Sequence, residues 1–228
     1  MRRILPVPLS LFLAVALGLC ALALAPGAAR ADTPPPEAAQ DAAKALPDLL
    51  QAIPGELLAG YGFEDPAQFA SATLGEPYQV RMILPDALLK ATADTPILSL
   101  ATDSPLWFFP VVVDGTSRVF VKVSLRDGAW KAFGIGMSPL ARQADAAKAD
   151  FPAAQGYSHA LVVSYQAGPA YFIVASRGQE AGIVPLGAGK TLAGTARAEA
   201  ASADARQAFL KRLQDAVRKN MQTPQGGI

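Results

Sequence analysis

Three β-rich runs separated by two Asp-Gly pairs constrain the fold of this 228-residue chain more than any other feature. The pairs are Asp114-Gly115 and Asp127-Gly128, and the runs around them fill residues 105–137. Asp-Gly favours a two-residue hairpin turn, because both turn positions must tolerate a positive φ angle. The sequence therefore predicts a three-stranded antiparallel meander over about residues 105–137.

The middle run of this meander predicts two different faces. Its apolar row, which should face a core because side chains alternate along a strand, is Val119, Val121, Val123 and Leu125. A two-residue loop at Asp127-Gly128 predicts that Val121 pairs with Gly134. By the same register, Phe120 should pair with Ile135. Pro110 in the first run has no N–H for a ladder, so we expect that strand at an edge of the sheet.

The opposite face of the predicted meander carries both aromatic and basic side chains. The residues that we interpret as a ligand or partner patch are Phe109, Phe120, Lys122, Lys131, Phe133 and Ile135. An exposed sheet face is normally polar, so an apolar one is either covered by a helix or used as a contact surface. We expect the closing helix to cover part of it through Phe209 and Leu213. The uncovered part, near Lys122 and Lys131, should take an anionic or aromatic-compatible ligand.

A second group of β-rich runs extends the predicted sheet. It covers about residues 158–186, and helical patterns occupy the segments 37–53, 138–151 and 204–220. The expected fold class is α+β, with an antiparallel sheet built from two three-stranded meanders (about 105–137 and 158–186) and flanking helices. Residues 37–228 are expected to form a single α+β domain, which follows a proline-rich linker at 32–36.

The N-terminus has the pattern of an export signal. A basic start at Arg2 and Arg3 precedes an apolar run over 9–25, and Ala29-Arg30-Ala31 fits the small-x-small cleavage rule. We expect a signal peptide over residues 1–31, cleaved between Ala31 and Asp32, and a periplasmic or secreted protein. If residues 4–25 are not cleaved, they would anchor the protein in the membrane, and this is the one membrane contact that the sequence predicts.

Removal of that signal changes the charge and the cysteine content. The mature chain keeps 17 Lys and Arg residues against 19 Asp and Glu, a net charge near −2, which argues against nucleic-acid binding. Cys20 is the only cysteine and leaves with the signal, so no disulfide and no thiol chemistry are expected.

The residue types that usually carry catalysis or bind metals are sparse. His159 is the only histidine, and its neighbour Ser158 should point to the other face of a strand, so the two should not form a dyad. One histidine and no mature cysteine argue against zinc or copper, and we expect no metal and no cofactor. The 187–191 segment imitates a phosphate loop, but Val184 stands where the first glycine is needed.

The sequence favours an exported, non-catalytic binding or protein-interaction module, with an unknown protein or small molecule as its partner. Two alternatives stay open. The first is a periplasmic hydrolase that uses carboxylates assembled in space, with Asp94, Asp103 and Glu180 as the residues to test. The second is a membrane-anchored sensor or assembly factor, which requires that residues 4–25 are retained.

Overall fold

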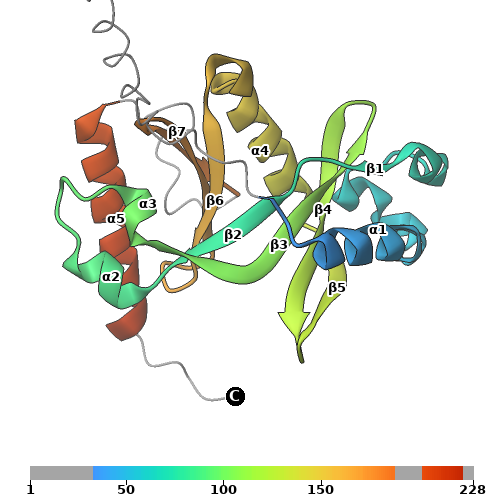
Figure 1. Ribbon diagram of the computed structural model, residues 1–228, viewed down its shortest axis with the longest axis horizontal. Helices are drawn as coiled ribbons and strands as arrows, with labels where there is room; N and C mark the ends of the chain where they lie inside the picture. The colour runs from blue at the N-terminus through green and yellow to red at the C-terminus, as the bar shows by residue number, and fades with distance from the viewer. Residues whose placement is uncertain (1–32, 188–201, 223–228) are drawn as a thin grey trace, which may run out of the picture.

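The computed structural model of the chain describes residues 33–187 and 202–222, without the side chains of residues 179–181 and 203. It is an α+β structure, with an eight-stranded, mostly antiparallel sheet and helices on both faces (Figure 1). The predicted α+β class is thereby confirmed. The expected signal peptide, its cleavage site and most of the 187–191 segment lie outside the described residues.

The helices and strands follow one another in a mixed order. The α-helices are α1 (Pro36–Gln51), α2 (Pro85–Lys90), α3 (Ile97–Leu100), α4 (Ser138–Asp150) and α5 (Ala203–Gln222). The 3-10 helices are η1 (Gly55–Tyr61), η2 (Pro66–Ser71) and η3 (Ala153–Gln155). The strands are β1 (Thr73–Leu74), β2 (Tyr78–Ile83), β3 (Ala101–Val113), β4 (Thr116–Arg126), β5 (Ala129–Gly136), β6 (Ser158–Ser164), β7 (Ala170–Arg177) and β8 (Gln179–Leu186).

The sheet has the strand order β5-β4-β3-β2-β6-β7-β8, and β1 pairs with β3 beside β2. Strands β3, β4 and β5 pair consecutively and antiparallel, and so do β6, β7 and β8. The parallel pair of β2 and β6 joins these two halves (Figure 1). Among the described pairings, β5 and β8 therefore form the two edges of the sheet.

Strand β3 lies inside the sheet, so the prediction that Pro110 marks an edge strand is wrong. On one side β3 pairs with β4 over residues 106–113, and on the other it pairs with β1 at Val112 and with β2 at Phe108. The Pro110 carbonyl accepts a hydrogen bond from the N–H of Gly75 (2.8 Å), so Pro110 faces the gap between β1 and β2. A ladder N–H is not needed at that gap, and proline is tolerated there.

A bulge in the β3–β4 pair overturns the predicted faces of the first strand. The register shifts between Val111 and Val112, so Val111 pairs with Val119 and Phe109 with Val121. The extra residue moves Phe109 to the same face as the valine row. A two-residue turn alone would have placed it beside Phe120.

A second bulge shifts the β4–β5 pair. The predicted pairs of Leu125 with Trp130 and of Val123 with Ala132 are confirmed, but the register shifts between Lys122 and Val123. Beyond that point Val121 pairs with Ile135 and Lys122 with Gly134, so the predicted pairs Val121–Gly134 and Phe120–Ile135 are wrong. Ile135 consequently joins the face of the valine row.

Helix α1 covers that face of the β3–β5 half. Their shared core includes Ala38, Ala42, Leu46 and Leu50 from the helix and Trp107, Phe109, Val119, Val121 and Val123 from the strands. Helix α4 covers the opposite face, where Leu140, Ala141, Ala144 and Ala147 pack against Phe108, Phe120, Leu161 and Ile173. Side-chain alternation along β4 explains the division, because Phe120 and its neighbours Val119 and Val121 point to opposite faces.

Helix α5 covers the β6–β8 half of the sheet, so its predicted role over the β3–β5 meander is wrong. Phe209 and Leu213 belong to a core with Val162, Phe172 and Ile183. The Phe209 and Phe172 rings meet edge to face with centroids 5.0 Å apart. Both figures place α5 at the opposite end of the molecule from β5.

Candidate functional site

The structure separates the six predicted patch residues into three environments. Phe109 is buried beneath α1, and Ile135 packs partly buried against the same core. Phe120 is fully buried beneath α4. Lys122, Lys131 and Phe133 remain together on the outer surface of the β4–β5 hairpin. The two bulges move Phe109 and Ile135 to the other face, whereas Phe120 keeps the face of Lys122 and is covered there by α4.

Arg126 completes the group, and we call Lys122, Arg126, Lys131 and Phe133 the basic face. Lys122 and Arg126 lie on the same side of β4 because they are an even number of residues apart. Lys131 pairs with Ser124, which lies between them on that side. Phe133 is the extra residue of the bulge, opposite Lys122. The alternation in the sequence could have identified Arg126, which the predicted patch omitted.

The Phe133 ring holds two cations of the basic face close together. The Lys122 Nζ lies 5.5 Å from the ring centroid, and the guanidinium carbon of Arg126 lies 4.4 Å from it. Arg126 Nε also donates a hydrogen bond to Ser124 Oγ (3.0 Å). Phe133 is 39% exposed. Attraction to the ring's electron-rich face offsets part of the repulsion between the two cations.

The basic face has no carboxylate partner among residues 33–187 and 202–222. Ion pairs there join Arg81 to Asp103 (3.1 Å) and Lys148 to Glu76 (2.8 Å). A third pair joins Arg218 to Asp215 on α5 (3.0 Å). None of these pairs involves a hairpin cation. An anion can therefore approach the basic face without displacing a carboxylate.

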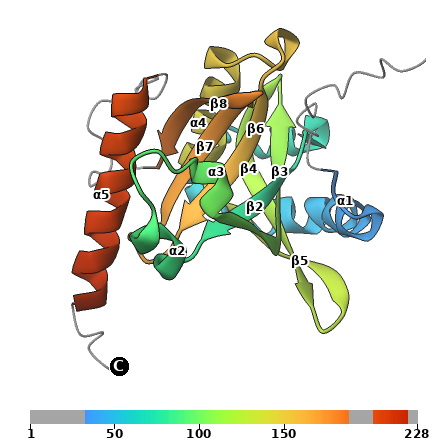
Figure 2. The same cartoon turned by 60° about the vertical axis from the view of Figure 1, so that its left-hand side comes forward.

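The hairpin projects from the rest of the molecule. Figure 2 shows that the turn between β4 and β5 extends beyond α1, away from the other end of the sheet. Residues 125–129 are all exposed, and Leu125, on the side opposite the basic face, is 44% exposed. The tip of the hairpin is accordingly a convex element with solvent on both sides.

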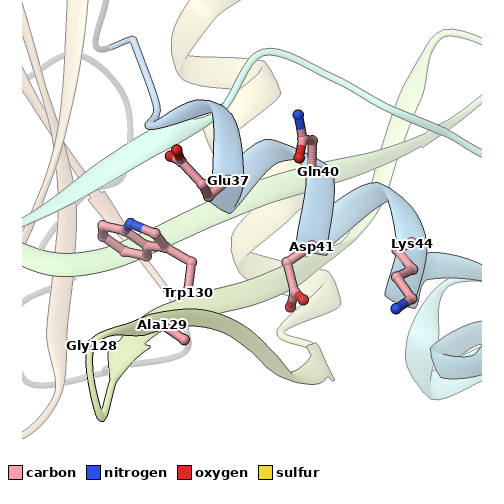
Figure 3. Close-up of a pocket in the computed structure, with 7 residues that line it drawn as sticks. All are labelled: Glu37, Gln40, Asp41, Lys44, Gly128, Ala129 and Trp130. Carbon is pink, nitrogen blue, oxygen red and sulfur yellow. The ribbon is translucent and has the colours of Figure 1, made fainter.

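A groove lies on the α1 side of the same hairpin, and we call it the Trp130 groove. Its volume is about 550 Å³, and it is lined by Glu37, Gln40, Asp41, Lys44, Gly128, Ala129 and Trp130. Figure 3 shows the Asp41 side chain extending from α1 toward the strand that carries Trp130, while the Glu37 carboxylate points away from that strand. Asp41 Oδ2 accepts a hydrogen bond from the N–H of Ala132 (2.5 Å). Sequence reasoning missed this groove, because the polar residues of α1 have the pattern of any solvated helix face.

The carboxylates considered for catalysis have separate surroundings. Asp103 pairs with Arg81, and Asp94 is exposed in the connection between α2 and α3. The side chain of Glu180 is not described. In the part of the chain that the structure describes, His, Cys, Asp and Glu residues form no group of three or more that could hold a metal ion.

Ser158 and His159 make different contacts, as expected for neighbours in a strand. The His159 Nε2 lies 2.7 Å from the carbonyl oxygen of Phe151, and Ser158 Oγ lies 2.9 Å from Ser176 Oγ. Burial lowers the pKa of His159, with a contribution from Lys148, while the Phe151 carbonyl and Glu76 oppose the shift. The neutral imidazole can donate its Nε2 proton to Phe151, which is a structural role.

Tyr78 is buried beneath α4 near charged side chains. Burial raises the pKa of its hydroxyl, and the carboxylates of Asp145 and Glu76 raise it further. The Lys148 Nζ lies 4.7 Å from the Tyr78 ring centroid. Asp145 accepts hydrogen bonds from the N–H (2.7 Å) and the Oγ (2.8 Å) of Ser117, which ties α4 to β4. The hydrogen bonds from Ser117 to Asp145 hold α4 in place, and Tyr78 is packed beneath the helix as a neutral phenol.

Comparisons with known proteins give no family for the chain. No family model, no curated protein and no solved structure matches it. None of the helices described here is long and apolar enough to cross a membrane.

Proposed function

We propose that this protein is an exported, non-catalytic binding module that contacts an anionic partner through the basic face of its β4–β5 hairpin. The observation that supports the proposal best is the stacking of Lys122 and Arg126 on the exposed ring of Phe133, with Lys131 on the same side of the hairpin. Export through cleavage of residues 1–31, and a sheet of two meanders at about 105–137 and 158–186, belong to the same proposal. The partner is a protein or another molecule that carries negative charge.

The charge of the basic face differs from that of the mature chain as a whole. With 17 basic and 19 acidic residues in the mature chain, a non-specific attraction to anions is not expected. A local cluster of cations that have no carboxylate partner among the described residues can still bind an anion, because charges interact over about 10 Å at 0.1 M salt. Binding through this surface should therefore depend on where the basic residues lie as well as on the net charge of the protein.

Retention on immobilised heparin tests the proposal. The exported protein should elute at a higher salt concentration than the variant Lys122→Gln/Arg126→Gln/Lys131→Gln. The matched control is Lys90→Gln/Arg177→Gln/Lys211→Gln, which removes the same charge from exposed positions elsewhere. If both variants lose retention equally, the basic face has no special role, and the proposal is wrong.

The Trp130 groove supports a second candidate function, the binding of a small organic cation. Two residues with carboxylates one helical turn apart, Glu37 and Asp41, line the groove together with Trp130. Carboxylates together with an indole ring suit an ammonium group. Choline should quench the fluorescence of Trp130 in a Trp107→Phe variant, and Glu37→Gln should weaken that response. Absence of quenching at millimolar choline would exclude this ligand class.

A further inference from the structure

The shape of the β4–β5 hairpin limits the kind of anionic partner that it fits. The basic face extends from Lys122 to Arg126, which is about 13 Å along the strand. It lies on a projecting hairpin and not in the Trp130 groove, which opens on the other side (Figures 2 and 3). A small anion would be held from one side only. An extended anionic surface could contact all three cations at once.

The hairpin also exposes apolar side chains on both of its sides. Phe133 is 39% exposed on the basic face, and Leu125 is 44% exposed on the opposite side, where it pairs with the half-buried Trp130. A protein partner would need a slot shaped to both sides of the tip. The interfacial region of a lipid bilayer is fluid and can surround a convex tip from all sides. Tryptophan and long basic side chains are enriched at this level of a membrane.

Several other basic residues of the protein are less available. On α5, Arg218 is paired with Asp215, and Arg206, Arg212 and Lys219 have interaction partners of their own. Lys148 is paired with Glu76. The hairpin combines three cations that have no carboxylate partner in the described chain with exposed apolar side chains. This combination is typical of segments that bind at a membrane surface.

We propose that the tip of the β4–β5 hairpin docks on an anionic phospholipid surface, with Arg126 and Lys131 at the phosphates and Leu125 in the interfacial layer, while Lys122, about 13 Å farther along the strand, is attracted by the charge of the same surface. This inference rests on the proposed function, because it names the anionic partner of the same basic face. It adds a membrane contact that is independent of residues 4–25. The contact is peripheral and reversible.

Cosedimentation with vesicles tests this contact. The exported protein should bind vesicles of phosphatidylglycerol and phosphatidylcholine in equal amounts, and not vesicles of phosphatidylcholine alone. Each basic residue near such a surface adds about fivefold to binding, so the triple glutamine variant of the hairpin should bind roughly 100-fold more weakly. The control triple at Lys90, Arg177 and Lys211 should bind almost as well as the wild type. High salt should release the protein.

Leu125→Gln separates docking from charge attraction alone. Leu125 is 44% exposed, so its replacement should leave the fold intact, which a circular-dichroism melt would check. The variant should bind the anionic vesicles several-fold more weakly and keep its retention on heparin. Equal vesicle binding by this variant would overturn the interfacial placement of Leu125 and with it the docking proposal.

Further outcomes separate the membrane from other anionic partners. If glycerol phosphate displaces the protein from vesicles at millimolar concentration, the site binds the headgroup chemistry in solution, and membrane docking is wrong. If vesicles are not bound while retention on heparin still requires the hairpin cations, the partner is an acidic macromolecule. In that case this inference fails and the proposed function stands. If neither vesicle binding nor heparin retention depends on the hairpin, both are wrong.

Discussion

The carboxylate of Asp41 accepts a hydrogen bond from the backbone N–H of Ala132, although the two residues are 91 positions apart in the chain. Asp41 lies in α1, and Ala132 lies in β5, at one edge of the sheet. The bond satisfies an N–H that has no neighbouring strand on that side. It also fixes α1 beside the hairpin, which creates the wall of the Trp130 groove.

Replacement of Asp41 by alanine should therefore destabilise the protein. We expect a loss of about 1–2 kcal/mol in the free energy of unfolding, since the half-buried acceptor is charged and the N–H of Ala132 loses its partner. Urea denaturation would measure the change. Asp48→Ala, at an exposed position of the same helix, is the control and should change stability by less than about 0.5 kcal/mol. Equal effects of the two changes would show that the bond is unimportant.

Gly182 and Phe151 form a contact that leaves no space for a side chain. A Cβ at Gly182 would overlap the Cζ of the Phe151 ring. Gly182→Ala should cost on the order of 1–3 kcal/mol through overpacking, measured by urea denaturation. In a Phe151→Leu background the same change should cost at least about 1 kcal/mol less. Additive effects in this double-mutant cycle would contradict the predicted contact.

Gly134 is a useful contrast in the same experiment. Its added Cβ would meet only the Lys122 side chain, at 3.5 Å, which is an ordinary contact distance. Gly134→Ala should thus cost less than Gly182→Ala. The ranking of the two melting temperatures checks this expectation.

The imidazole of His159 should make stability depend on pH. Burial lowers its pKa below the ordinary value of about 6.5, so the unfolded chain binds a proton more readily than the folded protein. The resulting loss in the free energy of unfolding is absent at neutral pH. It grows as the pH falls below the ordinary histidine pKa and is complete below the pKa of His159 in the folded protein. As the only histidine, His159 can be followed directly by proton NMR. A midpoint at or above the ordinary value would contradict the burial argument.

Helix α5 should be required for the stability of the β6–β8 half. Leu213 is fully buried against that half, and Leu213→Ala should cost about 2–5 kcal/mol in the free energy of unfolding. The exposed Lys211→Ala on the same helix serves as the control, with an expected effect below about 0.5 kcal/mol. A chain that ends at Thr195 should aggregate or melt much earlier. If that shorter chain stays folded and equally stable, α5 is not part of the core.

The sequence predicted the strands of the hairpins more reliably than their faces. Asp114-Gly115 and Asp127-Gly128 do form the turns, and both aspartates have positive φ angles of 51° and 50°. The pairing next to the second turn, Leu125 with Trp130, follows directly from its length. Turn chemistry is local, so it can be inferred from adjacent residues.

The candidate site was predicted only in part because the bulges are not local. A single extra residue at Phe133 in β5 reverses the face of Ile135, and another at Arg118 in β4 reverses that of Phe109. Gly134 gave a signal that the prediction did not use, since glycine inside a strand often marks a bulge. The residues nearest the second turn, Lys122 and Lys131, were correctly placed on one face.

The placement of the helices depended on contacts between distant segments. The amphipathic pattern of α5 shows that Phe209 and Leu213 are buried, but it does not specify which half of the sheet they cover. The amphipathic pattern of α1 likewise does not specify that this helix packs beside β5 and forms the Trp130 groove. The Asp41–Ala132 bond that forms this groove has no signature in either local sequence.

The most direct test of the account is a map of the anion-contacting surface by NMR. The protein, labelled with nitrogen-15, would be titrated with a short heparin oligosaccharide. We predict that the largest amide shifts occur at residues 122–133, and that residues 206–219 of α5 shift little. Shifts concentrated on α5, or spread evenly over the basic residues, would contradict the assignment of the basic face as the contact surface.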